Sequence, residues 1–358
     1  MIADIVKIFI PSVISFILGI AITPVISDFL YSRKMWKKQA GKTALDGTEA
    51  VVFNELHKEK ETGTPRMGGM IIWISAFITI AGLWVLDKVT LSPVFDKLDL
   101  LSRNQTWIPL MTLMVGAIVG LIDDILNIRA SKKEKFSGGL SLKQRLWPVV
   151  LIGLFCGYWF YDKLGISTLG TPGIFGGFDL GLWFIPFFAL VTLATYSGTI
   201  IDGIDGLSGG IFATIFAAYA GIAFYQQQIN LAAFCLVIVG AILAFLWFNI
   251  PPARFYMTET GSMALTVTLA VVAFMTDALG GGYGVFVLPI IALPLVITVA
   301  SNIIQIASKK LRGKKVFMVA PLHHHFEALG WPSYKVTMRY WIVGIISALL
   351  GVVLALVG

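Results

Sequence analysis

The residues best suited to chemistry are acidic side chains at the ends of apolar segments. They form three clusters: Asp123-Asp124 in GLIDDIL, Asp202 with Asp205 in IDGIDGLSGG, and Glu259 in FYMTETGS. Ionisable groups at membrane depth are costly, so they mark functional sites. Carboxylate oxygens are also the ligands that hard cations such as Mg²⁺ prefer. The clusters therefore predict Mg²⁺-assisted chemistry on an anionic substrate such as a phosphate.

Spacing within the first two clusters favours function over a purely structural role. Adjacent helical residues point about 100° apart, so one carboxylate of the Asp123-Asp124 pair can face a cavity while the other faces a neighbouring helix or a metal. A charged helix end that pairs with Arg129 is the alternative. Asp202 and Asp205 are three residues apart and share a face of a helical turn. A helix N-cap would account for only one of them.

Glu259 follows a break in the chain, because the double proline Pro251-Pro252 ends the preceding helix. Two interpretations of this glutamate have equal weight in isolation. It is a Mg²⁺ ligand, or it is a first-turn acid that the helix dipole favours.

A basic loop that is rich in histidine supplies the other candidate groups. The sequence KKLRGKKVFMVAPLHHHFE runs from Lys309 to Glu327 and contains His323, His324 and His325. Three consecutive histidines have poor geometry for a single tetrahedral zinc, and no cysteine accompanies them. Contact with a phosphate or general acid–base work suits them better. A solvated polar loop is the alternative.

The elements that position these groups are apolar helices. Of the 358 residues, 57% are hydrophobic and 13% charged, and the mean hydropathy of +0.84 is typical of a polytopic membrane protein. Because a helix needs roughly 20 apolar residues to cross the hydrocarbon, the sequence predicts an all-α protein. It has ten transmembrane helices, near residues 5–30, 69–86, 107–127, 146–161, 181–200, 207–225, 231–249, 262–278, 285–308 and 338–357. Cys156 and Cys235 lie inside apolar segments and offer no disulfide or metal framework.

Basic residues set the orientation of the helices. With ten spans the loops alternate sides, and one side holds only Lys88, Lys97, Arg103 and Lys163. The other side is rich in lysine and arginine, so we expect it to be cytoplasmic, with both termini extracytoplasmic. The net charge of +7 gathers there, where it would attract lipid headgroups and phosphorylated substrates. No nucleic-acid partner is expected, because the basic residues fringe helix ends.

We expect one integral-membrane domain, residues 1–358, because no polar linker is long enough to separate two. Within residues 168–181, glycine and proline residues flank Ile174-Phe175. This pattern predicts a small extracytoplasmic hairpin in which Asp179 caps a turn. No internal repeat is evident, which weakens a transporter interpretation based on inverted repeats.

Taken together, these motifs resemble the phospho-N-acetylmuramoyl-pentapeptide transferase family, within the polyprenyl-phosphate N-acetylhexosamine-1-phosphate transferase superfamily. The resemblance covers essentially the whole chain. It rests on GTPRMGG, the Asp-Asp pair, DGIDGL, NIPPARFYM with TGS, and APLHHHFE followed by GW, the most specific of these motifs.

The resemblance implies an enzyme of peptidoglycan synthesis in the plasma membrane, with its active site facing the cytoplasm. Such an enzyme requires Mg²⁺ and transfers phospho-MurNAc-pentapeptide from UDP-MurNAc-pentapeptide to undecaprenyl phosphate, giving lipid I and UMP. A second copy of the chain, in a homodimer, is a further candidate partner.

The resemblance also assigns roles by position. The implied catalytic residues are Asp123, Asp124 and His324. The implied metal ligands are Glu259 and Asp202. The implied substrate contacts are Asp202 and Asp205 beside the uridine, Asn249 and Tyr256 near the nucleotide, and Gln305 and His325 on the opposite polar wall.

Six positions depart from the family pattern. Tyr256 replaces the usual phenylalanine, and within MGDTGS Thr258 stands at the glycine and Glu259 at the aspartate, where it adds a methylene to the metal ligand. Thr199 replaces an asparagine, Arg66 stands inside the GTPTMGG motif, and Glu61 replaces a lysine. These departures concern substrate detail and activity level more than the fold.

The predicted chemistry is phosphoryl transfer, in which charge neutralisation and positioning dominate. In this hypothesis the lipid phosphate enters along a groove beside the ninth span and attacks the β-phosphorus, with Asp123 as base. A covalent aspartyl intermediate stays open. The alternative functions are a related polyprenyl-phosphate GlcNAc-1-phosphate transferase and a non-catalytic membrane transporter or scaffold. The pentapeptide's third residue, the lipid length and the oligomeric state are not specified by the sequence.

Overall fold

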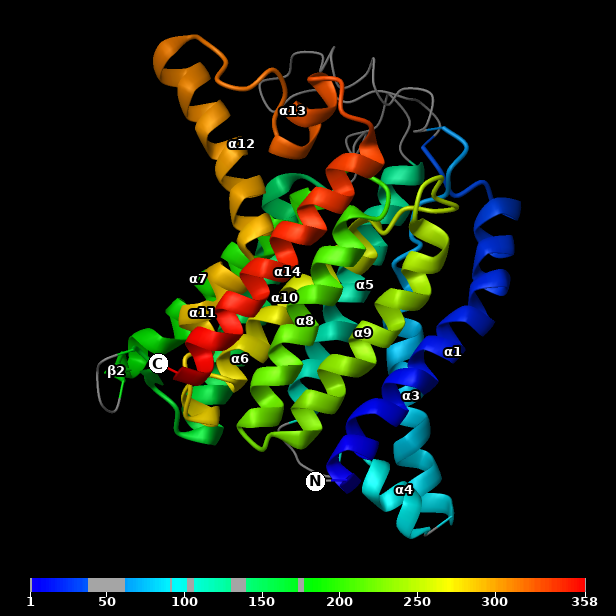
Figure 1. Ribbon diagram of the computed structural model, residues 1–358, viewed down its shortest axis with the longest axis vertical. Coiled ribbons are helices and arrows are strands. Elements are labelled where there is room, and N and C mark those ends of the chain that lie inside the picture. Colours follow the sequence, from blue (N-terminus) through cyan, green and yellow to red (C-terminus); the bar gives the residue numbers. More distant parts are fainter. Residues whose placement is uncertain are drawn as a thin grey trace.

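Helices built from the apolar runs make up nearly all of the computed structural model (Figure 1). The structure describes residues 2–37, 62–90, 92–101, 106–129, 140–172 and 177–357. Among the predicted features, the departure at Glu61 and the basic residues between positions 38 and 60 lie outside these ranges, as do those between positions 130 and 139.

The principal helices follow the predicted segments closely. They are α1 (Ile2–Ser32), α3 (Met70–Thr90), α5 (Trp107–Arg129), α6 (Leu142–Leu164), α7 (Phe184–Ser197), α8 (Leu207–Tyr225), α9 (Ile229–Asn249), α10 (Thr258–Met275), α11 (Gly284–Ile291), α12 (Leu293–Arg312) and α14 (Ser333–Val357). The shorter elements are α4 (Pro93–Leu98), α13 (Leu322–Ala328), the 3₁₀ turns η2 (Gly181–Trp183), η3 (Gly198–Ile201) and η4 (Ala278–Gly280), and the strands β1 (Thr168–Leu169) and β2 (Phe178–Asp179).

The prediction of a polytopic membrane protein is confirmed, but the predicted count of ten spans is not. Within the described ranges, eight helices are long and apolar enough to cross a membrane, and α11 with α12 gives a ninth if that pair, bent by 70°, counts as one span. The bend falls where Pro294, which has no backbone N–H to donate, opens α12. The remaining predicted segment, 146–161, does form α6. It is not among these candidate spans, and it has polar or charged residues at both ends, Lys143, Gln144 and Arg145 at the start and Asp162 and Lys163 at the end.

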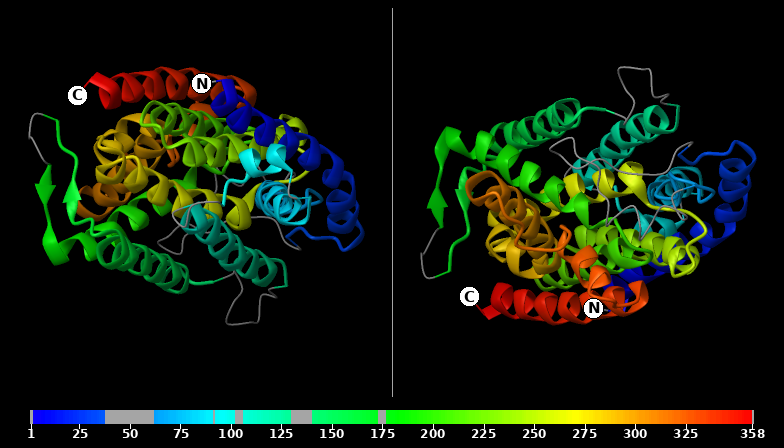
Figure 2. Two further views of the ribbon diagram at one scale, coloured as in Figure 1. Left: turned by 90° about the horizontal axis from the view of Figure 1, so that it is seen from below. Right: turned by 90° about the horizontal axis from the view of Figure 1, so that it is seen from above.

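The interior of the bundle is α10, in which almost every residue is buried, between α8 and α14 on one side and α5 and α6 on the other (Figure 2). Glycines on α5 let α10 approach closely. A Cβ atom added to Gly120 would collide with the backbone of Glu259, and one added to Gly116 would collide with Val267. The close approach brings the Asp123-Asp124 end of α5 against the first turn of α10.

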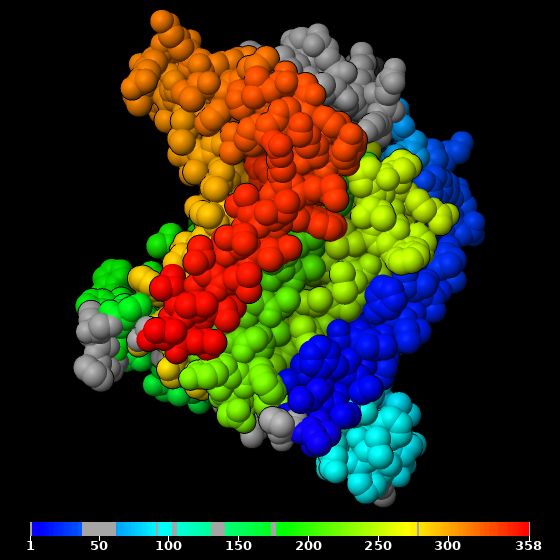
Figure 3. Space-filling model, in the orientation of Figure 1, coloured from blue at the N-terminus to red at the C-terminus, as the bar shows by residue number. Residues whose placement is uncertain are grey.

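The two ends of the bundle differ. Helix α13 and the far end of α12 lie at one end, and α4, the strands and both chain termini lie towards the other (Figure 1). Helix α12 stands out from the body of the protein beyond the bend (Figure 3). The termini therefore share an end of the molecule, as predicted, while the membrane side that they face stays a prediction.

The predicted hairpin is confirmed: β1 and β2 pair antiparallel, with Thr168 opposite Asp179. Its turn, around Ile174-Phe175, lies outside the described residues. Asp179 caps the chain as predicted, because its Oδ1 accepts a hydrogen bond from the Gly181 N–H (2.9 Å). Hydrogen bonds from the Ser167 hydroxyl and the Gly181 N–H lower the pKa of this exposed carboxyl.

A buried aspartate, Asp277, fastens the hairpin to the bundle. Its Oδ1 accepts a hydrogen bond from the Gly170 N–H (2.6 Å) and its Oδ2 accepts one from the Val285 N–H (2.9 Å). An asparagine there retains only one acceptor oxygen, and hydrogen bonds to charged groups contribute about 1.5–3 kcal/mol. We expect Asp277→Asn to lower the free energy of unfolding by about that amount, with kcat per folded molecule unchanged. Thermal unfolding in detergent measures this loss.

Asp179→Asn is the matched control, because Asp179 is on the same hairpin but exposed. Its unfolding temperature should stay close to that of the unsubstituted protein. Equal unfolding temperatures for the two variants would contradict the anchoring role of Asp277.

Candidate active site

The acidic pair lies in the last two turns of α5, and both side chains are completely buried. Asp124 points at the start of α10. Its Oδ2 accepts hydrogen bonds from the Thr258 hydroxyl (2.6 Å) and the Thr260 N–H (2.9 Å). Its Oδ1 lies 3.5 Å from an Arg66 guanidinium nitrogen. Asp124 therefore has partners on both oxygens and ties α5 to α10 and to the loop before α3.

Asp123 faces the start of α6. Its Oδ1 accepts a hydrogen bond from the Leu140 N–H (2.7 Å) and lies 3.2 Å from Arg145 Nε. The same guanidinium donates from NH1 to Glu259 Oε1 (3.0 Å). Arg145 therefore bridges the acidic pair of α5 and the glutamate of α10, so the first and third predicted clusters form one site. The second cluster joins this site through a backbone contact described below.

Two carboxylate oxygens in this site have no hydrogen-bond partner among the described residues. They are Asp123 Oδ2 and Glu259 Oε2, and both are buried. A buried carboxylate oxygen without a partner is costly, unless a ligand supplies the missing positive charge. Mg²⁺ is commonly bound by one or two carboxylates together with substrate phosphates. The donor set therefore fits such an ion.

Asp202 takes part in the site mainly as an acceptor. Its Oδ1 accepts a hydrogen bond from the Ser208 hydroxyl (2.7 Å), and its Oδ2 accepts one from the Thr258 N–H (2.8 Å). In the part of the chain that the structure describes, no three His, Cys, Asp or Glu side chains are grouped so as to hold a metal ion. The assignment of Asp202 as a metal ligand stays a prediction.

The loop that carries Asp205 is fixed from two sides. Asp205 Oδ2 accepts a hydrogen bond from the Ala253 N–H (3.3 Å). Asn249 receives the Gly206 N–H on its Oδ1 (2.9 Å) and donates from Nδ2 to the Phe255 carbonyl (2.8 Å). Asn249 is buried, so in this structure it joins two loops. Its predicted nucleotide contact is untested.

The histidines pack against the aspartate loop. A Cβ atom added to Gly203 would lie 2.6 Å from His323 Nε2 and 2.8 Å from His324 Nε2, so a side chain larger than hydrogen would displace both rings. His324 Nδ1 lies 2.7 Å from Glu327 Oε2, and Glu327 Oε1 accepts a hydrogen bond from the Ser333 hydroxyl (2.7 Å). A carboxylate only accepts, so Nδ1 carries the proton. The Nε2 atom of His324 is left facing the Asp202 loop.

The other predicted substrate contacts have local partners. Gln305 is buried, and its side-chain amide accepts from the N–H groups of Val316 and Phe317 and donates to the Phe317 carbonyl. His325 Nδ1 lies 3.3 Å from the Met318 N–H, which donates to it. Tyr256 is half-buried, and its backbone pairs with Pro65 and Gly68. Gln305 lies in α12 and His325 in α13, each bonded to the segment between these helices, and their substrate roles stay predictions.

Three residues of this site were not predicted as functional. Arg145 and Arg66 entered the sequence analysis only as a topology signal and as a departure from the family pattern, yet they pair with the buried acids. Thr258 contacts both Asp124 and Asp202. The sequence carried a weak signal for these arginines. Buried carboxylates in an apolar chain need cationic partners, and the arginines next to span ends are candidates for that role.

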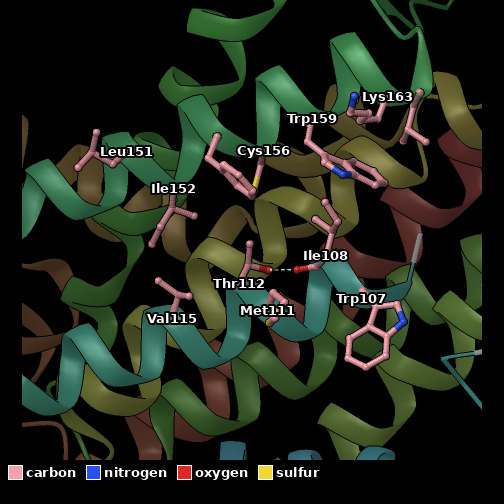
Figure 4. Close-up of a pocket in the computed structure, with 12 residues that line it drawn as sticks. Trp107, Ile108, Met111, Thr112, Val115, Leu151, Ile152, Cys156, Trp159 and Lys163 are labelled. Atoms are coloured by element: carbon pink, nitrogen blue, oxygen red, sulfur yellow. Dashed lines mark hydrogen bonds between the residues drawn. The ribbon is translucent and has the colours of Figure 1, made fainter. Parts of the chain in front are cut away.

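A large cavity of about 1140 Å³ lies away from this site. It lies between α5 and α6, at the end of α5 away from the acidic pair. Trp107, Met111, Phe155, Trp159 and Lys163 are among its lining residues (Figure 4). Among the described residues that line it, the ionisable side chains are Cys156 and Lys163, neither of which is suited to phosphoryl transfer.

Comparisons with known proteins point to one kind of enzyme. The model of glycosyl transferase family 4 matches residues 106–277. A phospho-N-acetylmuramoyl-pentapeptide-transferase from Levilactobacillus brevis is 35% identical over 298 residues, which cover 82% of this chain and 85% of the relative. A protein of the same name from Oceanobacillus iheyensis is 33% identical over 353 residues, 98% of each chain. The family match includes the three acidic clusters and ends before the histidines.

Proposed function

Because the chain belongs to the phospho-N-acetylmuramoyl-pentapeptide transferase family, we propose that it transfers phospho-MurNAc-pentapeptide from UDP-MurNAc-pentapeptide to undecaprenyl phosphate. The products are lipid I and UMP. One observation carries the proposal: two buried aspartates, a half-buried glutamate and two arginines from four separate segments converge on one site. Buried charge of this kind is expensive to maintain without a function.

The reaction joins two anionic substrates, so the site must offset charge. A bound Mg²⁺ would neutralise negative charge on the UDP pyrophosphate. The residues that fit it are Asp123 and Glu259, because each has a buried oxygen without a partner among the described residues. Arg145 holds the second oxygen of each carboxylate and so keeps both side chains oriented.

In the transfer step an oxygen of the lipid phosphate attacks the β-phosphorus of the UDP-sugar. A P–O bond forms there, and the bond from the β-phosphorus to the bridging oxygen breaks, so UMP leaves with that electron pair. Of the acidic pair, Asp123 is better placed than Asp124 to accept a proton or to attack. Both Asp124 oxygens have partners, whereas Asp123 Oδ2 has none among the described residues. Because one oxygen cannot hold the ion and act as base at the same time, this role leaves Glu259 as the principal ligand.

The position of the site supports a cytoplasmic location. The acidic clusters lie at the end of the bundle that carries α13 and the basic residues after α12, away from both termini. If that basic end is cytoplasmic, the UDP-sugar reaches the site from the cytoplasm and the lipid phosphate from the inner leaflet.

One assay tests the proposal. The purified protein, with Mg²⁺ and undecaprenyl phosphate, receives either UDP-MurNAc-pentapeptide or UDP-GlcNAc, and UMP and the lipid product are measured. UMP release with the first sugar alone supports the proposal, and release with the second alone indicates the GlcNAc-1-phosphate transferase. Release with neither would exclude both. Chelation of Mg²⁺ should abolish release.

His324→Ala should lower turnover about 100-fold, at the low end of what an acid–base group contributes, and change the affinity for UMP far less. The reason is that Glu327 fixes the imidazole with Nε2 towards the Asp202 loop, where the doubly protonated imidazolium can donate from Nε2 to a phosphate oxygen. Steady-state kinetics and UMP titration measure the two effects.

His323→Ala is the comparison variant. His323 is completely buried and packs between His324 and Tyr340, so its truncation should act chiefly on the unfolding temperature. Equal, modest losses of turnover in the His323, His324 and His325 alanine variants would remove the catalytic assignment of His324.

A further inference from the structure

Thr258 has a backbone conformation that its side chain disfavours. It is the first residue of α10, it is buried, and its φ is +55°. A β-branched residue in the left-handed region is a real outlier, and such strain persists only where the surrounding structure over-determines it. A glycine would adopt the same angle without strain. The strain therefore points to a role that the threonine side chain performs.

In this left-handed conformation Thr258 contacts two carboxylates, Asp202 from the loop before α8 and Asp124 from α5. Its N–H donates to Asp202 Oδ2 (2.8 Å), and its hydroxyl lies 2.6 Å from Asp124 Oδ2. One residue thereby links the second acidic cluster to the first.

The hydroxyl also holds a third segment. The Met67 N–H donates to Thr258 Oγ1 (3.0 Å), so the single hydroxyl proton is left for Asp124. Met67 is itself left-handed, with φ +69°, and belongs to the GTPRMGG loop that presents Arg66 to Asp124. Two residues with positive φ therefore meet at one hydrogen bond. Thr258 contacts Asp124 directly, and Met67 directly follows Arg66, which pairs with the same carboxylate.

We propose that Thr258 is a positioning residue, whose hydroxyl orients Asp124 and fastens the residue 62–69 loop so that the acidic site is assembled for transfer. The proposal rests on the transferase function proposed above for its kinetic part and on the structure alone for its geometric part. Glycine supplies the backbone angle but not the hydroxyl, and valine supplies the shape but not the hydroxyl. Serine supplies the hydroxyl.

These three substitutions separate strain from hydrogen bonding. Thr258→Val and Thr258→Gly should each lower kcat about 10- to 100-fold, the range expected when a catalytic group is slightly misplaced, with KM for the UDP-sugar changed less than about 3-fold. Thr258→Ser should keep most of the turnover. Thr258→Gly should unfold at a higher temperature than Thr258→Val, because it relieves the strain that both threonine and valine carry.

If Thr258 only stabilised the fold, kcat per folded molecule would be the same in all three variants as in the unsubstituted protein, and only the unfolding temperature would differ. That result would overturn the proposal, as would a serine variant no better than valine. Should the valine variant fail to fold, the glycine and serine variants decide the question.

Amide hydrogen exchange of the segment containing Met67 gives a readout that does not need activity. Exchange at Met67 should be faster than in the unsubstituted protein for Thr258→Val and Thr258→Gly, and unchanged for Thr258→Ser. Unchanged exchange in all three variants would contradict the hydroxyl tie. If the unsubstituted protein released no UMP, the transferase proposal would fail, and the exchange data would still decide whether the tie exists.

Discussion

Asp124→Asn should lower kcat at least about 1000-fold, which corresponds to about 4 kcal/mol of activation free energy. Asp124 is completely buried and receives two hydrogen bonds on Oδ2 and an arginine on Oδ1. An asparagine keeps one acceptor oxygen and places an NH₂ group against a donor or against Arg66. The substitution therefore loosens the segment before α3 and the start of α10 together, and it leaves the half-buried Arg66 without its charge partner. UMP release per folded molecule measures the loss.

Asp87→Asn is the matched control for this substitution. Asp87 is another buried acid paired with a cation, Lys88 (2.7 Å), but it lies at the end of α3 farther from Arg66 and the acidic site. Its kcat should stay near that of the unsubstituted protein even if its unfolding temperature falls. If Asp124→Asn retained wild-type turnover, the buried carboxylate would be a packing feature and the proposed active site would be wrong.

The positions of the helices could be predicted from the apolar runs in the sequence. Each predicted span became a helix because about 20 apolar residues have few other ways to satisfy their backbone in a membrane. The count failed at α6, which has polar or charged residues at both ends and is not among the candidate spans. The bend between α11 and α12 was also not predicted, although Pro289 and Pro294 stand on either side of it.

The acidic residues of the site could be predicted individually, but their partners could not. Carboxylates in an apolar chain are conspicuous by composition alone. The pairing of Arg145 with Glu259, 114 residues apart, depends on how α5, α6 and α10 pack, and no periodicity along the chain encodes it. Thr258 was invisible for another reason: its importance lies in a backbone angle that favours glycine.

Gln305 illustrates the opposite case, in which a residue matched a motif but found a local partner. All of its recorded hydrogen bonds go to residues 316 and 317, which fold back onto the last turns of α12. A motif specifies the residue type, whereas the loop conformation decides which groups the residue contacts. A contact between Gln305 and a nucleotide would compete with the hydrogen bonds that its side-chain amide already makes to residues 316 and 317.

Glu259→Gln should lower turnover at least about 100-fold at limiting Mg²⁺, which corresponds to about 2.7 kcal/mol. Three carboxylates and two guanidinium groups form the site, and incoming pyrophosphate and lipid phosphate add further negative charge. A divalent cation offsets that excess, and Glu259 Oε2 is one of the two buried oxygens that fit it. Glutamine keeps the size of the side chain but removes the charge that a hard cation needs. Kinetics across a Mg²⁺ titration measures the effect.

Glu259→Asp is the matched control, because it keeps the charge and shortens the side chain by one methylene, giving the residue that the family pattern usually has. It should retain most of the turnover and need a similar Mg²⁺ concentration, whereas the glutamine variant should recover in part as Mg²⁺ rises. The contrast involves Arg145, because glutamine removes one of the two carboxylates that its guanidinium pairs with and leaves the pair with Asp123. Near-normal turnover of Glu259→Gln at limiting Mg²⁺ would exclude Glu259 as a principal ligand and would leave Asp123 as the acid to test next.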